Sequence, residues 1–159
     1  MSPRKDSIRQ QMEADHAVSL SILKSLTPEQ WAMPVPSDEG AQWTAKDVLS
    51  HLAVSEAGHV GQITRAVAGE EPVPADFDLT RFNRRTAQKR ADATVSDLLK
   101  ELESAYGQLL AKLDEVAEVD FDKTGRHARG DTLTVEGFFR RCAEHRRQHA
   151  EGLNKAVGG

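Results

Sequence analysis

The sequence predicts an all-α protein with the architecture of a four-helix bundle. Apolar residues recur every three or four positions over four long segments, which is the period of an amphipathic helix. No stretch alternates apolar with polar residues for the length of a strand, and aromatic residues make up only 5% of the chain. A chain of 159 residues corresponds to one domain, so we expect a single domain over residues 1–159. Four amphipathic helices bury their apolar faces most simply as a bundle.

The first two long helices are predicted over residues 4–26 and 44–69. Thr27-Pro28 ends the first, and proline at a first helical position then permits a short turn over residues 29–31. The Pro- and Gly-containing residues 33–40 predict a loop. Thr44 and Asp47 form a variant of the capping box, which predicts the start of the second helix.

A short helix and two further long helices follow. Residues 78–90 predict a short surface helix whose basic residues form a solvated face or bind an anion. The third long helix begins at Thr94 or Ser96, runs to Val116 and carries a regular leucine stripe. A loop is expected over 118–131, and the fourth long helix over 134–156.

Composition excludes several classes of protein. The chain has 21 Lys and Arg against 25 Asp and Glu, and this net charge of −4 argues against a dedicated nucleic-acid binder. Cys142 is the only cysteine, which excludes an internal disulfide and a cysteine-based zinc finger. The N-terminus lacks the apolar region of a signal peptide, and no apolar run is long enough for a membrane span. We therefore expect a cytoplasmic protein with a small-molecule substrate and no nucleic-acid or membrane partner.

Two histidines on the fourth long helix are the main candidates for a functional site. At 100° per residue, His145 lies about −20° and His149 about +20° from Phe138, which predicts both in the middle of the buried face. Imidazoles four residues apart on a helix can chelate one metal ion. The alternative is two core histidines that each have a separate hydrogen-bond partner. His51 and His59 on the second helix compete for a third ligand position, and the helical wheel does not separate them.

Three carboxylates lie where they could support such a site. Asp47, one turn before His51, could accept the free ring N–H of that histidine, or could serve only as favourable charge at the helix start. Glu56 and Asp15 interrupt apolar stripes, where a buried carboxylate needs a partner. Glu56 is our candidate for a general base, and Asp15, like Asp47, for a residue that orients the metal ligands. Glu56 and Asp15 could each equally form an ion pair with an arginine.

The remaining polar residues are weaker candidates for a functional role. Arg146 follows His145 where zinc proteases of the zincin type have glutamate, so that motif is excluded. Cys142 could approach a metal but fits better as a small buried hydrophobe. His16 and His127 are interpreted as surface residues. Trp31 and the Pro-rich segment after it predict exposed apolar surface, and hence a homodimer.

The chain resembles the DinB superfamily of metal-binding four-helix bundles, which includes the YfiT-like proteins. Three parts carry the resemblance: WTAKDVLSHLA at 43–53, Phe82-Asn83 with the basic stretch and leucine-rich helix after it, and EHRRQHAEGL at 144–153 with its HxxxH motif. The resemblance implies a metal site of His51, His145 and His149, and so favours His51 over His59. It also implies zinc or nickel as the ion, and a homodimer.

The activity that the resemblance implies is thiol chemistry. Family members include thiol-dependent isomerases and S-transferases that use mycothiol or bacillithiol, and some hydrolases. We find no counterpart of the extra C-terminal domain of mycothiol-dependent maleylpyruvate isomerase, so that reaction is not expected. We expect a metal-dependent S-transferase acting on a small electrophile. The alternatives are a metal-dependent hydrolase and a non-catalytic stress protein that binds a metal or a small molecule.

Overall fold

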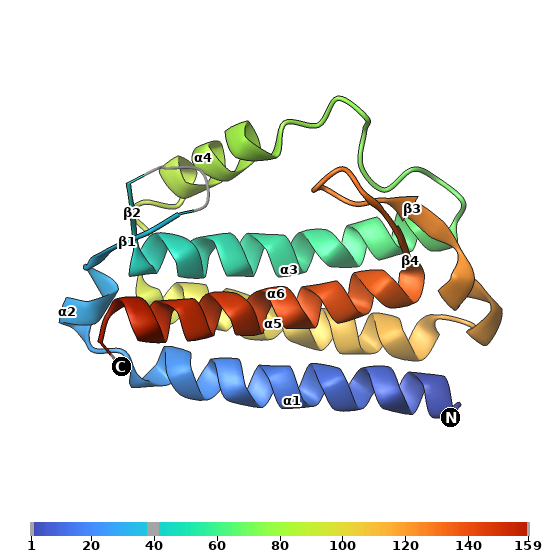
Figure 1. Cartoon of the computed structure of the whole chain (residues 1–159), viewed down its shortest axis with the longest axis horizontal. Helices are drawn as coiled ribbons and strands as arrows, with labels where there is room; N and C mark the ends of the chain where they lie inside the picture. Colours follow the sequence, from blue (N-terminus) through green and yellow to red (C-terminus); the bar gives the residue numbers. More distant parts are fainter. Residues whose placement is uncertain (1, 38–41, 159) are drawn as a thin grey trace.

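Four long helices lie side by side in the computed structural model, which describes residues 2–37 and 42–158 (Figure 1). The predicted bundle is confirmed. Its long helices are α1 (Pro3–Ser25), α3 (Ala45–Val67), α5 (Val95–Glu115) and α6 (Val135–Ala156).

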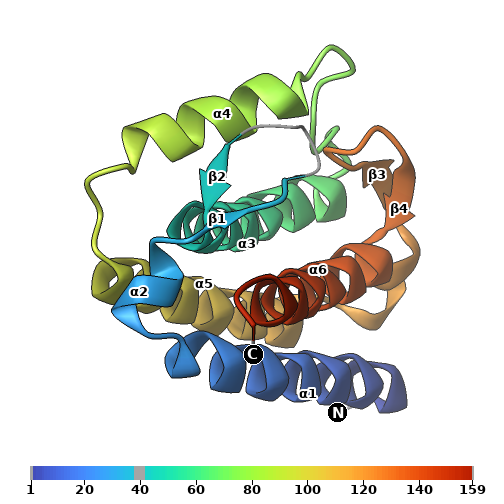
Figure 2. The ribbon, with the colours of Figure 1, turned by 60° about the vertical axis from the view of Figure 1, so that its left-hand side comes forward.

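The order of the helices around the bundle requires one long connection. α3 packs against α5 and α6, and α1 packs chiefly against α6. α1 and α6 run in one direction, and α3 and α5 run in the other (Figure 1). Because α3 and α5 are parallel, the chain between them must return along the bundle. This return, which we call the crossover (residues 68–94), contains α4 (Leu79–Lys89) and lies on the outer side of α3 (Figures 1 and 2).

Side-chain caps set the helix starts near the predicted positions. Thr44 Oγ1 accepts a hydrogen bond from the Asp47 backbone N–H at 3.3 Å, and Asp47 Oδ2 accepts one from the Thr44 N–H at 2.9 Å, so the predicted capping box is confirmed. Thr94, rather than Ser96, caps α5. Asp78 caps α4, and Thr134 caps α6.

The prediction that the chain has no strands was wrong in two short places. Two antiparallel ribbons form, and their strands of two or three residues are too short to show alternation in the sequence. The remaining short elements are α2 (Pro28–Trp31), β1 (Pro34–Val35), β2 (Trp43–Thr44), the 3₁₀ helix η1 (Glu118–Asp122), β3 (Thr124–Arg126) and β4 (Thr132–Thr134). We call β3, β4 and their turn the hairpin. Residues 38–40 of the predicted 33–40 loop lie outside the described residues.

The apolar surface predicted at Trp31 is not exposed. Trp31 is only 6% exposed and packs with Val35 and Trp43 in the cluster that closes one end of the bundle. Met33 is the more exposed side chain of this segment, at 37%. Homodimerisation stays a prediction, but Trp31 no longer supports it. No helix in the described part of the chain is long and apolar enough to cross a membrane.

Candidate metal centre

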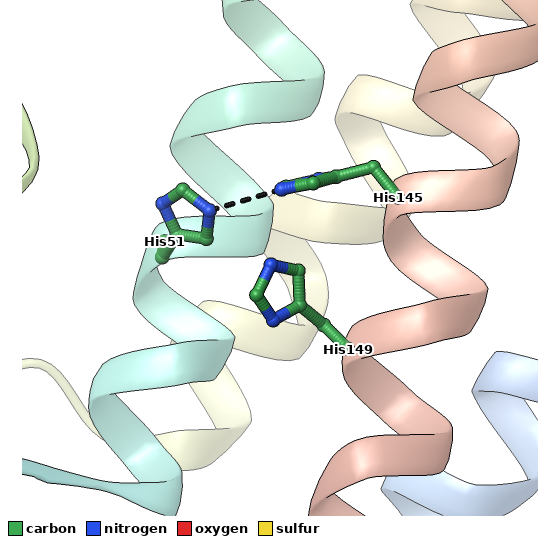
Figure 3. Close-up of side chains that lie close together, drawn as sticks. All are labelled: His51, His145 and His149. Atoms are coloured by element: carbon green, nitrogen blue, oxygen red, sulfur yellow. Dashed lines mark hydrogen bonds between the residues drawn. The ribbon is translucent and has the colours of Figure 1, made fainter. Parts of the chain in front are cut away.

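Three histidines from two helices converge at one point. His145 and His149 project from α6 toward α3, where His51 faces them (Figure 3). The Nε2 atoms of His51 and His145 are 3.1 Å apart, and one ring nitrogen from each of the three histidines lies within 4.8 Å of the others. The structure therefore brings together the three residues that the family resemblance implies.

The spacing of these nitrogens suits one metal ion. Zinc binds imidazole nitrogen at about 2.0–2.1 Å, so two nitrogens in a tetrahedral site lie roughly 3.4 Å apart. The 3.1 Å separation is close to this value. Three imidazoles fill three positions of a tetrahedral site, which leaves the fourth for water or substrate. The arrangement fits a catalytic rather than a closed structural site.

His145 and His149 lie at the edge of the buried face of α6, not in its middle as predicted. Both are half-buried, whereas Arg146 is only 2% exposed. Arg146 falls about 80° from Phe138 on the helical wheel, so the centre of the buried face is displaced from the position assumed in the prediction. This displacement leaves the imidazoles against the core on one side and open to a cavity on the other.

The environment keeps His145 neutral. Burial lowers the pKa of His145 far below its ordinary value, and the neighbouring His149 and His51 lower it further. A metal ligand must be unprotonated, so this shift favours the form that binds metal.

A cavity of about 650 Å³ opens on the three histidines. Its floor is formed by α3 and α6, and its other walls by the crossover and the hairpin, which both lie over this side of the bundle (Figure 2). A volume of this size is typical of a small-molecule site. The long connection between α3 and α5 therefore also encloses the candidate site.

A second histidine pair lines the same cavity. His59 and His127 are buried, and their Nε2 atoms are 3.1 Å apart. His59 Nδ1 donates to the Ser55 carbonyl at 2.7 Å, and His127 Nδ1 accepts from the Arg129 backbone N–H at 3.2 Å. The proton between the rings therefore belongs to His127 Nε2, which donates to His59. His59 therefore pairs with His127 and is not the third member of the cluster.

The interpretation of His127 as a surface residue was wrong. It is 5% exposed, and burial, with smaller effects of His59 and Arg141, lowers the pKa of His127 to about 4. His16 is not a free surface residue either, since its ring stacks on Tyr106 at 3.7 Å between centroids.

Glu56 forms a buried ion pair. Both Glu56 and Arg146 are 2% exposed, and Arg146 Nε donates to Glu56 Oε1 at 2.9 Å, with Nη2 donating to the same oxygen. Burial raises the pKa of the Glu56 carboxyl, and Arg146 acts in the opposite direction. Arg146 Nη1 also donates to His16 Nδ1 at 2.6 Å, and its guanidinium lies over Tyr106. One side chain from each long helix thus joins this network.

The remaining predicted residues have identified contacts. Asp15 accepts a hydrogen bond from Arg147 Nη1 at 3.1 Å, which is the arginine pairing considered as its alternative. Asp47 bonds to Thr44 in the cap of α3. The Cys142 thiol lies 3.6 Å from Glu56 Oε1, in the core. Roles of Glu56, Asp15 and Asp47 at a metal remain predictions.

The sequence profile of the DinB superfamily matches residues 11–152 of this chain. No curated protein matches the chain significantly.

Solved structures share the fold at low sequence identity. YfiT from Bacillus subtilis, described as a probable metal-dependent hydrolase, is 23% identical with a TM-score of 0.73, over 99% of this chain and 90% of YfiT. The mycothiol-dependent maleylpyruvate isomerase is 14% identical with a TM-score of 0.79, over 96% of this chain but only 63% of the isomerase. The colibactin self-resistance protein ClbS, solved with double-stranded DNA, is 15% identical with a TM-score of 0.77, over 98% of this chain and 96% of ClbS. These likenesses support the fold.

Proposed function

The chain belongs to the DinB superfamily, and on this premise we propose that it is a metal-dependent enzyme that joins a low-molecular-weight thiol to a small electrophile. The observation that carries the proposal is the meeting of His51, His145 and His149 at the wall of a ligand-sized cavity. Three neutral ligands leave the full double charge of a divalent ion uncompensated, which suits an anionic nucleophile such as a thiolate.

The three histidines would hold one zinc or nickel ion. When bound, such an ion supplies Lewis acidity, which lowers the pKa of a thiol or water that reaches it. The cavity of about 650 Å³ beside the histidines is where the thiol and the electrophile would bind. In the transfer, the thiol loses its proton, its sulfur bonds to an electrophilic carbon, and the electrophile releases a leaving group or takes up a proton. Mycothiol and bacillithiol are the candidate thiols, the first because the chain is similar in fold to a mycothiol-dependent enzyme.

Hydrolysis is the second candidate. It uses the same three histidines, with water in place of the thiol, and the similarity to YfiT, a probable metal-dependent hydrolase, favours it. A protein that binds metal or a small molecule without turnover is the remaining alternative.

A paired experiment tests the proposal. The metal content of the purified protein is measured first, and the loaded protein is then screened with mycothiol, bacillithiol and glutathione against small electrophiles. We expect conjugation that requires both the metal and one of the thiols. Product formation with water alone would favour the hydrolase. Stoichiometric metal without any turnover would favour the binding protein. The matched controls are His149→Ala, which should lose metal and activity together, and His59→Ala, which should keep the metal.

A further inference from the structure

The walls of the cavity carry a charge opposite in sign to that of the whole chain. The chain has a net charge of −4, yet among the described residues that line the cavity three are arginines and one is a glutamate. They are Arg65, Arg129, Arg141 and Glu144. A cleft lined by one sign of charge concentrates ligands of the other sign.

Arg129 and Arg141 flank the end of the cavity nearest the hairpin. Arg141 forms a two-bond ion pair with Asp131, at 2.8 and 2.7 Å, and Nη1 also lies 3.4 Å from His127 Nδ1. Arg129 is in the turn of the hairpin and is exposed, and its backbone N–H holds His127 in place. The Arg129 side chain is thus the cation of this end that is most accessible to a ligand in the cavity.

The opposite wall is apolar and partly uncovered. Phe77 and Phe82 of the crossover lie with their ring centroids 5.4 Å apart, and both line the cavity. Phe82, on the short and mostly polar helix α4, is 43% exposed. An exposed large apolar side chain of this kind often marks a surface that binds a ligand or partner. A planar or branched apolar group between this pair and α3 would cover it.

We propose that the cavity binds a small amphipathic anion, whose apolar body contacts Phe77 and Phe82 and whose carboxylate or sulfonate bonds to Arg129 near Arg141. The proposal names the substrate class of the proposed enzyme, and in that respect it rests on the proposed function. Guanidinium groups bind such anions through two parallel hydrogen bonds, which gives both affinity and orientation.

The test compares two fluorescent probes that differ only in the anionic group. Anilinonaphthalene sulfonate and its uncharged parent, phenylnaphthylamine, are titrated into the metal-free and the metal-loaded protein. We expect one sulfonate probe per chain, bound at least about tenfold more tightly than the uncharged one, since a hydrogen bond to a charged group contributes about that factor. Arg129→Gln should remove most of this preference, and Phe82→Ser should weaken both probes. Arg85→Gln on the exposed face of α4, outside the cavity, is the matched control and should change neither.

The outcomes separate this proposal from the metal site. Equal affinity for the two probes, or a preference that survives in Arg129→Gln, overturns the proposal even when the protein holds stoichiometric metal. A preference that Arg129→Gln abolishes in the metal-free protein supports it, including in the case where no metal is found and the proposed function fails. Unfolding curves of each variant establish that the losses do not come from a disrupted fold.

Discussion

Replacing Glu56 with Gln should destabilise the fold more than any exposed charge replacement on the same helices. The change keeps the shape and one acceptor oxygen but removes the negative charge that faces Arg146, both residues being 2% exposed. Removing one partner of a buried ion pair costs about 3–5 kcal/mol of unfolding free energy. Because the amide oxygen that Glu56→Gln introduces can still accept a hydrogen bond, we expect a loss near the lower end, about 3 kcal/mol. For a domain of this size that corresponds to a loss of roughly 6–12 °C in Tm.

The assay is thermal unfolding of the metal-free protein, with Glu151→Gln as the matched control. Glu151 pairs with Arg147 at 2.6 Å on the surface, where such a pair contributes about 1 kcal/mol or less. The double replacement Glu56→Leu with Arg146→Met should recover part of the lost stability, because neither charge is then buried alone. A Tm for Glu56→Gln within the range of the control, together with weakened metal binding, would refute the ion-pair reasoning and support the role at the metal predicted from the sequence.

Three further predictions concern the pH dependence of stability, metal binding and the homodimer that the family resemblance implies. The unfolding free energy of the metal-free protein should fall as the pH drops from 6.5 towards 4. In the unfolded state His127 takes up a proton at the ordinary histidine pKa of about 6.5, whereas in the folded state its pKa is about 4. His127 alone therefore accounts for a fall of about 3 kcal/mol in the unfolding free energy. Denaturant titrations should show a smaller fall in His127→Gln. A divalent ion at one hundred times its Kd should add about 2.7 kcal/mol to the unfolding free energy, and a chelator should reverse the accompanying rise in Tm. Light scattering at micromolar concentration should show a dimer; a monomer throughout the concentration range would remove that prediction.

Much of the fold was predictable because its determinants are local. The helix starts depend on threonine and aspartate caps next to apolar stripes, and Thr44 with Asp47 shows both bonds of the capping box. The hairpin was not predictable, since its strands Thr124–Arg126 and Thr132–Thr134 are too short for any period to appear. The burial of His127 depends on how this hairpin packs against the bundle, and no local pattern carries that information.

The candidate site was partly predictable for the same reason. The spacing of His145 and His149 already indicates a chelating pair, because both are on one helix. His51 and His59 differ by eight residues, or roughly 12 Å along the axis, so the choice between them depends on the axial register of α3 against α6. That register arises from tertiary packing and is not visible on a helical wheel. The wheel did contain a signal for Arg146, whose position near Cys142 and Leu153 places a charge on the buried face and calls for a partner.

The most direct test of the central claim is the metal content of the wild-type protein and of four single variants, measured by elemental analysis after dialysis near neutral pH. We predict one divalent ion per chain in the wild type and in His59→Ala, and loss of stoichiometric metal in His51→Ala, His145→Ala and His149→Ala. The cluster geometry supports this division, since His51, His145 and His149 each place one ring nitrogen within 4.8 Å of the others. Stoichiometric metal that survives in His51→Ala but is lost in His59→Ala would contradict the account.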